Sequence, residues 1–163
     1  MDVLCHIGID VPLDVVFSYY SDQARLQEWI PGGGILEFTP LSAPPKKPGS
    51  RYRMAYRSFG VTFRLITELT ALDTNRLSVM EQVSGDYKCF RYEMHFSPAG
   101  ANGSQLAMRI TARLPWGILG SFADWLSRPL VRGDIEKALQ RFKAGVEALE
   151  YQPPAPTSHA GRV

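Results

Sequence analysis

Apolar and polar residues alternate over residues 3–10, with Val3, Cys5 and Ile9 in the apolar set, as in a strand that buries one face. The same two-residue period predicts further strands at 35–39, 51–58, 61–71, 76–84, 87–97 and 104–114. Short connections join the last five, and short connections require neighbouring strands to pair antiparallel. The pattern therefore predicts a seven-stranded antiparallel sheet.

Helical spacing of apolar residues appears in three segments. It predicts a helix over residues 13–20 and a second short helix within residues 21–30, ended by the glycine triplet at 32–34. A much longer run, 117–151, predicts a final helix that Pro129 and Gly133 are expected to kink or interrupt. The order is strand, two short helices, six strands and a long helix. Such a sheet and helix can bury each other when the sheet curls around the helix, which makes the fold α+β.

The chain has 163 residues, which fits one domain, predicted at 1–151. Residues 152–163 contain three prolines and no apolar period, and are predicted to form a disordered tail. No apolar run reaches the length of a membrane-spanning helix, and the first residues do not resemble a signal peptide. A cytoplasmic location is therefore expected.

Five segments carry a resemblance to a known family: 9–17, 22–29, 48–52, 96–100 and the end of the last helix at 146–147. Together they resemble the START-like helix-grip superfamily (SRPBCC), in its polyketide cyclase/dehydrase and lipid-transport branch, over about residues 1–150. The resemblance implies a curved sheet wrapped around the long helix, and it favours a cavity between them. It implies no catalytic motif, because the family includes ligand carriers, cyclases, hydrolases and regulators.

Turn lengths predict which side chains face the helix. A two-residue turn at Phe59-Gly60, or a longer loop of the same parity, places Tyr56 opposite Phe63 and Met54 opposite Leu65. A three-residue turn at 73–75 would pair Leu69 with Val79 and Thr67 with Glu81. A type II′ turn at Gly85-Asp86 would pair Val79 with Tyr92, Leu77 with Met94 and Glu81 with Phe90. A two-residue turn at Thr74-Asn75 would instead bring Met80 inside.

These registers define an inward and an outward face of the sheet. The predicted inward residues are Tyr52, Met54, Tyr56, Phe63, Leu65, Thr67, Val79, Glu81, Val83, Phe90, Tyr92, Met94, Met108 and Ile110. The predicted outward residues are Arg53, Arg57, Arg64, Arg91, Glu93, His95, Arg109 and Arg113.

The charge and the metal-binding residue types exclude several functions. The net charge is +2, from 18 basic and 16 acidic residues, which argues against a nucleic-acid partner. The two cysteines and three histidines are scattered without ligand spacing, so neither a metal nor another cofactor is predicted. In the resembled fold Cys5 and Cys89 lie two strands apart, about 9–10 Å, and both are expected to be free thiols.

The inward polar residues suggest either a wet cavity or a solid core in which they bond one another, and the residues alone leave both open. If Glu81 lies inside, burial would raise its pKa and make it the best candidate for an acid or base. Alternatively Glu81 lies near a strand end or pairs with an arginine. The residues predicted to bind a ligand are Trp29, Tyr52, Met54, Tyr56, Phe63, Leu65, Thr67, Glu81, Phe90, Tyr92, Met94, Met108, Trp116, Phe122, Trp125 and Leu126.

The chain has 18 aromatic residues and 5 methionines, and those of the sheet that fall on one concave face favour an apolar pocket. We therefore expect the protein to bind a hydrophobic or aromatic small molecule, such as a lipid, a polyketide or an isoprenoid-like compound, between sheet and long helix. One alternative is a cyclase or dehydratase acting on a polyketide-like substrate. The other is a regulatory module that binds a protein partner and has a filled interior. The oligomeric state is left open.

Overall fold

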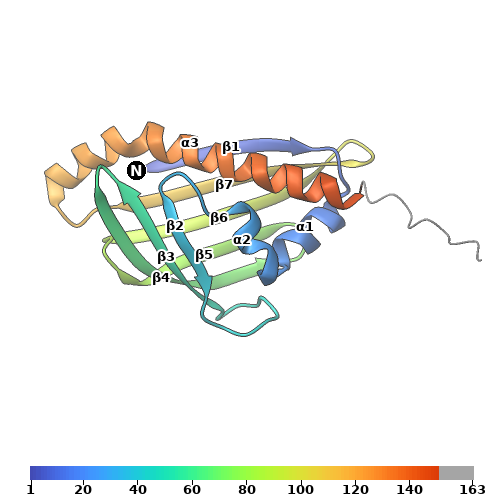
Figure 1. Ribbon diagram of the computed structural model, residues 1–163, viewed down its shortest axis with the longest axis horizontal. Coiled ribbons are helices and arrows are strands. Elements are labelled where there is room, and N and C mark those ends of the chain that lie inside the picture. Colours follow the sequence, from blue (N-terminus) through green and yellow to red (C-terminus); the bar gives the residue numbers. More distant parts are fainter. Residues whose placement is uncertain (151–163) are drawn as a thin grey trace, which may run out of the picture.

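The computed structural model describes residues 1–150, except for the side chains of residues 118, 119, 121, 124 and 150. The predicted tail at 152–163 lies outside the described residues, so the domain boundary at 151 stays a prediction. The elements are β1 (Asp2–Ile9), α1 (Leu13–Ser21), η1 (Gln23–Arg25), α2 (Leu26–Trp29), β2 (Ile35–Pro40), β3 (Arg51–Ser58), β4 (Val61–Asp73), β5 (Leu77–Gly85), β6 (Cys89–Ala99), β7 (Gly103–Arg113) and α3 (Gly117–Glu150) (Figure 1).

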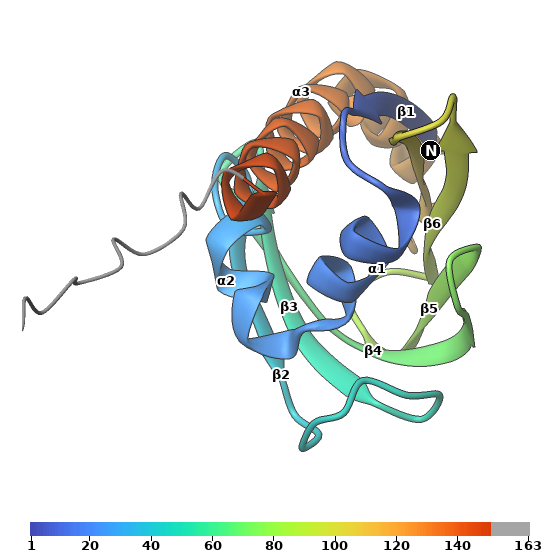
Figure 2. The ribbon, with the colours of Figure 1, turned by 90° about the vertical axis from the view of Figure 1, so that its right-hand side faces the viewer.

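The seven strands form one antiparallel sheet in the order β1-β7-β6-β5-β4-β3-β2. Figure 2 shows the sheet curled into an open half-barrel, with α3 along its open side and α1 and α2 filling one end. The predicted α+β helix-grip architecture is therefore confirmed. No helix in the described part of the chain is long and apolar enough to cross a membrane.

The alternation at the start of the chain produces the expected buried face. Val3, Cys5, Ile7 and Ile9 are buried, whereas the residues between them are exposed. This face packs against α3, whose inward residues include Ile135, Leu139, Phe142 and Val146. Helix α3 runs without interruption from Gly117 to Glu150, so neither Pro129 nor Gly133 interrupts it, and the alternative of a kink there stays a prediction.

The β3–β4 hairpin has the predicted register. Tyr56 lies opposite Phe63 and Met54 opposite Leu65, and the turn consists of Phe59 and Gly60. Both turn residues have positive φ, 48° and 77°, which is the requirement of a type I′ turn. The turn holds the Phe59 side chain on the surface, 58% exposed.

The predicted registers of β5 are wrong by one residue. The β4–β5 ladder is irregular at Thr70 and again at Val83, and each bulge reverses which side chains face inward. Leu69 therefore lies opposite Met80 rather than Val79, and Thr67 lies opposite Gln82 rather than Glu81. Met80 is buried, while Val83, predicted inward, is 48% exposed.

The β5–β6 connection is also longer than a two-residue turn. The ladder pairs Met80 with Tyr92 and ends where Glu81 pairs with Arg91, after which β5 continues beside β4. Gly85 there has φ 141° and pairs with Leu65. The position requires glycine, because a Cβ at Gly85 would lie 2.6 Å from the backbone of Leu65. Strands β5 and β6 are thus unpaired with each other at this end of the sheet.

Both cysteines are free, as expected: Cys5 is buried and Cys89 is exposed. They lie on strands that flank β7, opposite Met108 and Arg113 respectively. The two β7 positions are five residues apart, or roughly 17 Å along the strand. This offset adds to the expected lateral spacing and places the thiols well beyond disulfide reach.

Candidate ligand-binding cavity

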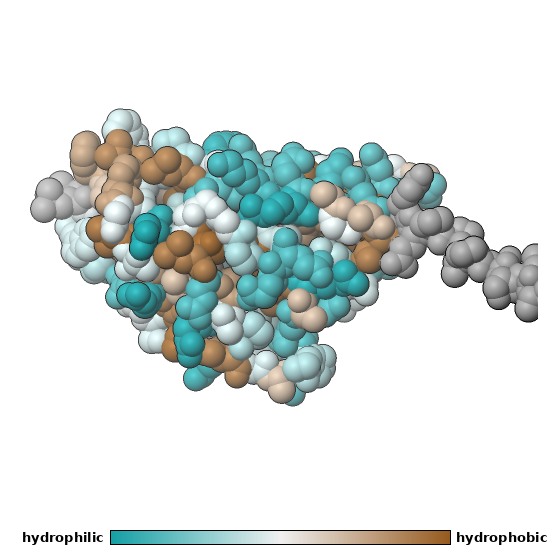
Figure 3. Space-filling model, in the orientation of Figure 1, coloured by the Kyte–Doolittle hydropathy of each residue, from teal (hydrophilic) through white to brown (hydrophobic). Residues whose placement is uncertain are grey.

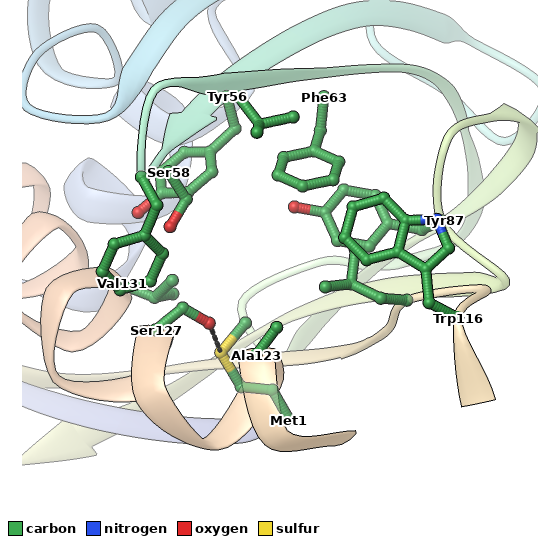
Figure 4. A pocket seen from close by; sticks show the side chains of 12 residues that line it. Met1, Tyr56, Ser58, Phe63, Tyr87, Trp116, Ala123, Ser127 and Val131 are labelled. Carbon is green, nitrogen blue, oxygen red and sulfur yellow. Dashed lines mark hydrogen bonds between the residues drawn. The ribbon is translucent and has the colours of Figure 1, made fainter. Parts of the chain in front are cut away.

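A cavity of about 120 Å³ lies between the β3–β4 hairpin and the first half of α3 (Figure 4). We call it the main cavity, and its walls are Met1, Tyr56, Ser58, Phe59, Val61, Phe63, Tyr87, Leu114, Trp116, Ala123, Ser127 and Val131. Phe59, Val61 and Trp116 are also about half exposed, so the main cavity opens to the surface beside them.

A smaller space of about 60 Å³, the side chamber, lies deeper along the sheet. It shares the walls Met1, Tyr56, Tyr87 and Val131 with the main cavity. Its other walls are Ile35, Met54, Ala55, Leu65, Phe90, Ile110, Ala112, Asp134 and Ile135. The two spaces together follow the end of the sheet where β5 and β6 have separated.

Aromatic rings form one side of the main cavity. The Phe63 ring lies 5.1 Å from that of Tyr87 and 6.0 Å from that of Trp116, and Tyr87 lies 5.8 Å from Phe90, measured between ring centroids. These are tilted contacts within the favourable range for aromatic pairs. The rings come from β4, the β5–β6 connection, the β7–α3 connection and β6, so four parts of the chain build this wall.

Besides Ser58 and Ser127 of the main cavity, a hydrogen-bonded polar pair interrupts the apolar lining. The Tyr56 hydroxyl on β3 donates a hydrogen bond to Oδ2 of Asp134 on α3, at 3.0 Å. The same oxygen accepts the backbone N–H of Gly34 at 2.9 Å. Burial, and then the Asp134 charge, raise the pKa of Tyr56, so its phenol stays protonated and remains a donor at neutral pH.

The glycine triplet makes room for this pair. A Cβ on Gly34 would lie 2.5 Å from the Tyr56 ring and 2.8 Å from the Arg57 carbonyl oxygen. Gly33 has φ 62° and lies directly against the Asp134 carboxylate. The triplet therefore brings backbone close enough to Asp134 to donate to it, and it ties the start of β2 to α3.

Apart from Glu81, the ligand residues predicted from the sequence divide into three groups. Met54, Tyr56, Phe63, Leu65, Phe90 and Trp116 line the main cavity or the side chamber. Trp29, Tyr52, Thr67, Tyr92, Met94 and Met108 are buried in the core away from both spaces. Phe122, Trp125 and Leu126 are on the surface, 46% to 64% exposed.

Glu81 is placed on the outer face of the sheet, and the prediction that it points inward is wrong. Its carboxylate accepts from Nη1 of Arg91 at 2.5 Å, and the side chain is 42% exposed. The alternative weighed for it, pairing with an arginine, is what the structure shows. Other residues expected on the outer face, such as Arg53, His95 and Arg109, are exposed there.

The inward polar residues near α1 form a closed hydrogen-bonded cluster. Tyr20 donates to Oγ of Ser78 at 2.7 Å, and Nε2 of Gln23 donates to the Tyr52 hydroxyl at 3.1 Å. Tyr92 interacts with Tyr20, and burial raises the pKa of both phenols. In this part of the core the solid-core reading of the tyrosines is correct.

Lys46 completes that end of the core from the proline-rich loop between β2 and β3. Its Nζ lies 3.4 Å from the centroid of the Tyr20 ring, and it has no hydrogen-bond partner among the described residues. The side chain is buried, and desolvation holds the pKa of its amine well below the ordinary value.

Several cavity residues were missed in the sequence. Val131, Asp134 and Ile135 share one face of α3, so Asp134 is a carboxylate inside an otherwise apolar helical stripe. This carboxylate in an apolar stripe was the signal in the sequence that could have indicated a cavity residue. Met1, Ala123 and Ser127 gave none, because their role depends on where α3 crosses β1; Ser127 contacts Met1 there, with its Oγ 3.8 Å from the sulfur.

Comparison with solved structures supports the same architecture. A protein from Thermus thermophilus, TTHA0849, superposes with a TM-score of 0.77 at 19% identity, covering 91% of this chain and 99% of the other. The Zhui aromatase/cyclase from Streptomyces sp. R1128 gives 0.73 at 13% identity, covering 93% and 96%. A START superfamily protein from Mycobacterium smegmatis gives 0.69 at 16% identity, covering 91% and 98%. At these identities the likeness concerns the fold alone.

The curled sheet and the long helix define a START-like helix-grip protein. A family profile described as polyketide cyclase/dehydrase and lipid transport matches residues 6–147. The chain belongs to that family. No curated protein is a significant match to the sequence.

Proposed function

We propose that this protein binds a hydrophobic or aromatic small molecule in the main cavity and the side chamber. The observation that carries the proposal is an apolar, aromatic-walled cavity with a half-buried polar pair, Tyr56 and Asp134, in its wall. Ligand sites commonly combine apolar walls with a few placed polar groups. The family description, which includes lipid transport, is consistent with it.

The volume limits what can bind without rearrangement. A dry apolar cavity of about 150 Å³ is large enough for benzene. The main cavity, at about 120 Å³, therefore fits little more than one ring or a short branched chain. A larger lipid or polyketide would require the β3–β4 hairpin or the first turns of α3 to move outward.

The polar pair defines how a ligand would be oriented. A ligand hydroxyl could donate to the Asp134 carboxylate or to the Tyr56 oxygen, and a ligand carbonyl could accept from Tyr56 in place of Asp134. The aromatic wall of Phe63, Tyr87 and Trp116 would cover the apolar part. A small phenol or an enone is thus the simplest chemical class that satisfies both.

The test uses two matched substitutions on the same helix. Ala123→Phe places a ring in the main cavity, whereas Ala144→Phe places the same ring on the exposed side of α3. Native mass spectrometry of the full chain should show an apolar compound co-purifying with the parent and with Ala144→Phe, but not with Ala123→Phe. Titration with phenol, followed by NMR, should show binding by the parent and by Ala144→Phe but not by Ala123→Phe. Equal phenol binding by all three proteins would contradict the proposal.

A second candidate is a cyclase or dehydratase reaction, and the Tyr56–Asp134 pair is the observation that favours it. Asp134 could accept a proton from a carbon beside a carbonyl, while Tyr56 donates a hydrogen bond to the oxygen that becomes an enolate. Glu81 cannot serve, since it lies on the outer face. Loss of turnover with retained ligand affinity in Asp134→Asn would support this candidate, and absence of turnover in the parent would exclude it. The remaining alternative, a regulatory module with a filled interior, is not supported by the cavity.

A further inference from the structure

Seven large apolar side chains are exposed together at the end of the molecule where α3 begins. We call this surface the apolar end; it consists of Phe59, Val61, Trp116, Phe122, Trp125, Leu126 and Leu130, each 46% to 64% exposed. Figure 3 shows brown surface gathered at this end, while teal surface predominates along the rest of the visible face. Single exposed apolar residues scattered over a surface are ordinary, whereas a contiguous apolar patch of this kind marks a contact site.

Helix geometry links this surface to the cavity. Successive helical residues are about 100° apart, so the strip of Phe122, Leu126 and Leu130 adjoins the strip of Ala123, Ser127 and Val131. The second strip lines the main cavity, and the first is exposed. Across the opening, Phe59, Val61 and Trp116 belong to both the cavity wall and the exposed surface. The cavity therefore opens within the apolar end.

Four basic residues are close in the chain to residues of the apolar end. Arg57 precedes the Phe59 turn, Arg128 lies between Leu126 and Leu130, and Lys88 and Arg113 are held together by a backbone hydrogen bond of 2.8 Å beside Trp116. Among the described residues none of these four, the basic rim, pairs with a carboxylate. Elsewhere on the sheet, Arg51, Arg53, Arg91 and Arg109 each pair with one. From 113 to 132 the sequence has three arginines and one acidic residue, Asp124.

We propose that the apolar end docks on an anionic lipid bilayer. Tryptophan and phenylalanine favour the region between headgroups and acyl chains, and surface-binding elements combine them with lysine and arginine that contact anionic headgroups. The basic rim supplies that complementarity. A second copy of the chain is the less favoured occupant, since symmetric pairing would bring two basic rims together. Docking would also place the cavity opening against the hydrocarbon, and this part rests on the proposed function.

The experiment measures flotation of the full chain with vesicles of phosphatidylcholine alone and of equal parts phosphatidylcholine and phosphatidylglycerol. Binding should require phosphatidylglycerol and weaken as salt is raised. The double variant Phe122→Ser/Trp125→Ser, which alters no cavity wall, should lower partitioning by at least about tenfold. Its matched control is Leu4→Ser/Leu36→Ser, at exposed apolar positions on β1 and β2, which should bind like the parent. Arg113→Gln and Arg128→Gln should each lower binding by roughly fivefold.

Failure to float with the mixed vesicles at low salt would overturn the proposal, as would equal binding by the two double variants. Sedimentation velocity provides the competing outcome: a dimer that Phe122→Ser/Trp125→Ser dissociates, without vesicle binding, would assign the surface to a second copy. Phenol titration in the absence of vesicles separates this proposal from the proposed function. A protein that binds phenol but not vesicles retains the cavity function and loses the docking surface, and the reverse result would retain docking alone.

Discussion

The hydroxyl of Tyr56 donates to Oδ2 of Asp134 across 3.0 Å and thereby connects β3 to the middle of α3. This bond is the polar link between the sheet and the helix at the cavity, and Gly34 adds a second donor to the same oxygen. The bond has both a structural and a chemical role, because a ligand that bonds Tyr56 or Asp134 would compete with the contact that joins the sheet to the helix.

Replacing Tyr56 by Phe should lower the free energy of unfolding by about 1–2 kcal/mol, because a hydrogen bond to a partly buried carboxylate is lost while the ring is kept. The measurement is urea unfolding followed by circular dichroism. The matched control is Tyr19→Phe, whose hydroxyl bonds the more exposed Glu28. An effect of Tyr56→Phe no larger than that of Tyr19→Phe would show that the sheet–helix link contributes little.

Two glycines offer a matched pair for alanine substitution. Gly34→Ala should destabilise the protein by about 1–3 kcal/mol, since its Cβ would meet the Tyr56 ring at 2.5 Å and the Arg57 backbone at 2.8 Å. Gly133→Ala, inside α3 with nothing within 4 Å of the new Cβ, should stabilise it by about 0.5–1 kcal/mol. Thermal unfolding checks both signs. Equal midpoints for the two variants would contradict the close approach at Gly34.

The buried Lys46 predicts a pH-dependent stability. Its folded pKa is lowered by desolvation, so between that value and the unfolded value near 10.5 the unfolded chain binds one more proton. Stability from this group therefore rises as pH increases through that interval and is flat below the folded pKa. Lys46→Met should raise the free energy of unfolding at neutral pH, on the order of 1–3 kcal/mol, and should remove the rise.

The neighbouring Lys47 provides the control, because its side chain is exposed. Lys47→Met should change the free energy of unfolding by less than about 0.5 kcal/mol at any pH. Urea titrations between neutral pH and pH values near 10 compare the three proteins. A parent and a Lys46→Met variant with parallel pH profiles would show that the amine is solvated.

Glu81→Gln should leave phenol binding, and any turnover, unchanged. The carboxylate lies on the outer face and pairs with Arg91, so the substitution removes an exposed ion pair with a cost of about 0–1 kcal/mol. Asp134→Asn is the contrasting variant, and isothermal titration calorimetry with phenol compares the two. A loss of binding in Glu81→Gln, with Asp134→Asn unaffected, would reverse the assignment of the site.

The sequence predicted the regular parts of this fold well. Turn parity was sufficient for Tyr56 and Phe63, because the Phe59-Gly60 turn joins two uninterrupted strands. It failed for Glu81, because the extra residues at Thr70 and Val83 shift the register and leave no signature in an alternating pattern. Only part of the cavity wall could be predicted from the sequence. The wall residues on the sheet follow from turn parity, whereas Met1, Ser127 and Asp134 depend on how α3 lies across the sheet, and the periodicity of the sequence does not contain that tertiary relation.

The early end of the β5–β6 ladder has a mechanical consequence. Beyond Glu81 and Arg91 these strands are linked through side chains, such as Nε2 of Gln82 donating to the Tyr87 carbonyl oxygen at 2.8 Å, while β4–β5 and β6–β7 continue as ladders. Spreading the sheet at this seam would cost few backbone hydrogen bonds. Opening this seam is therefore a second route, beside outward movement of the β3–β4 hairpin or the first turns of α3, by which a guest larger than one ring could be accommodated without unfolding any strand.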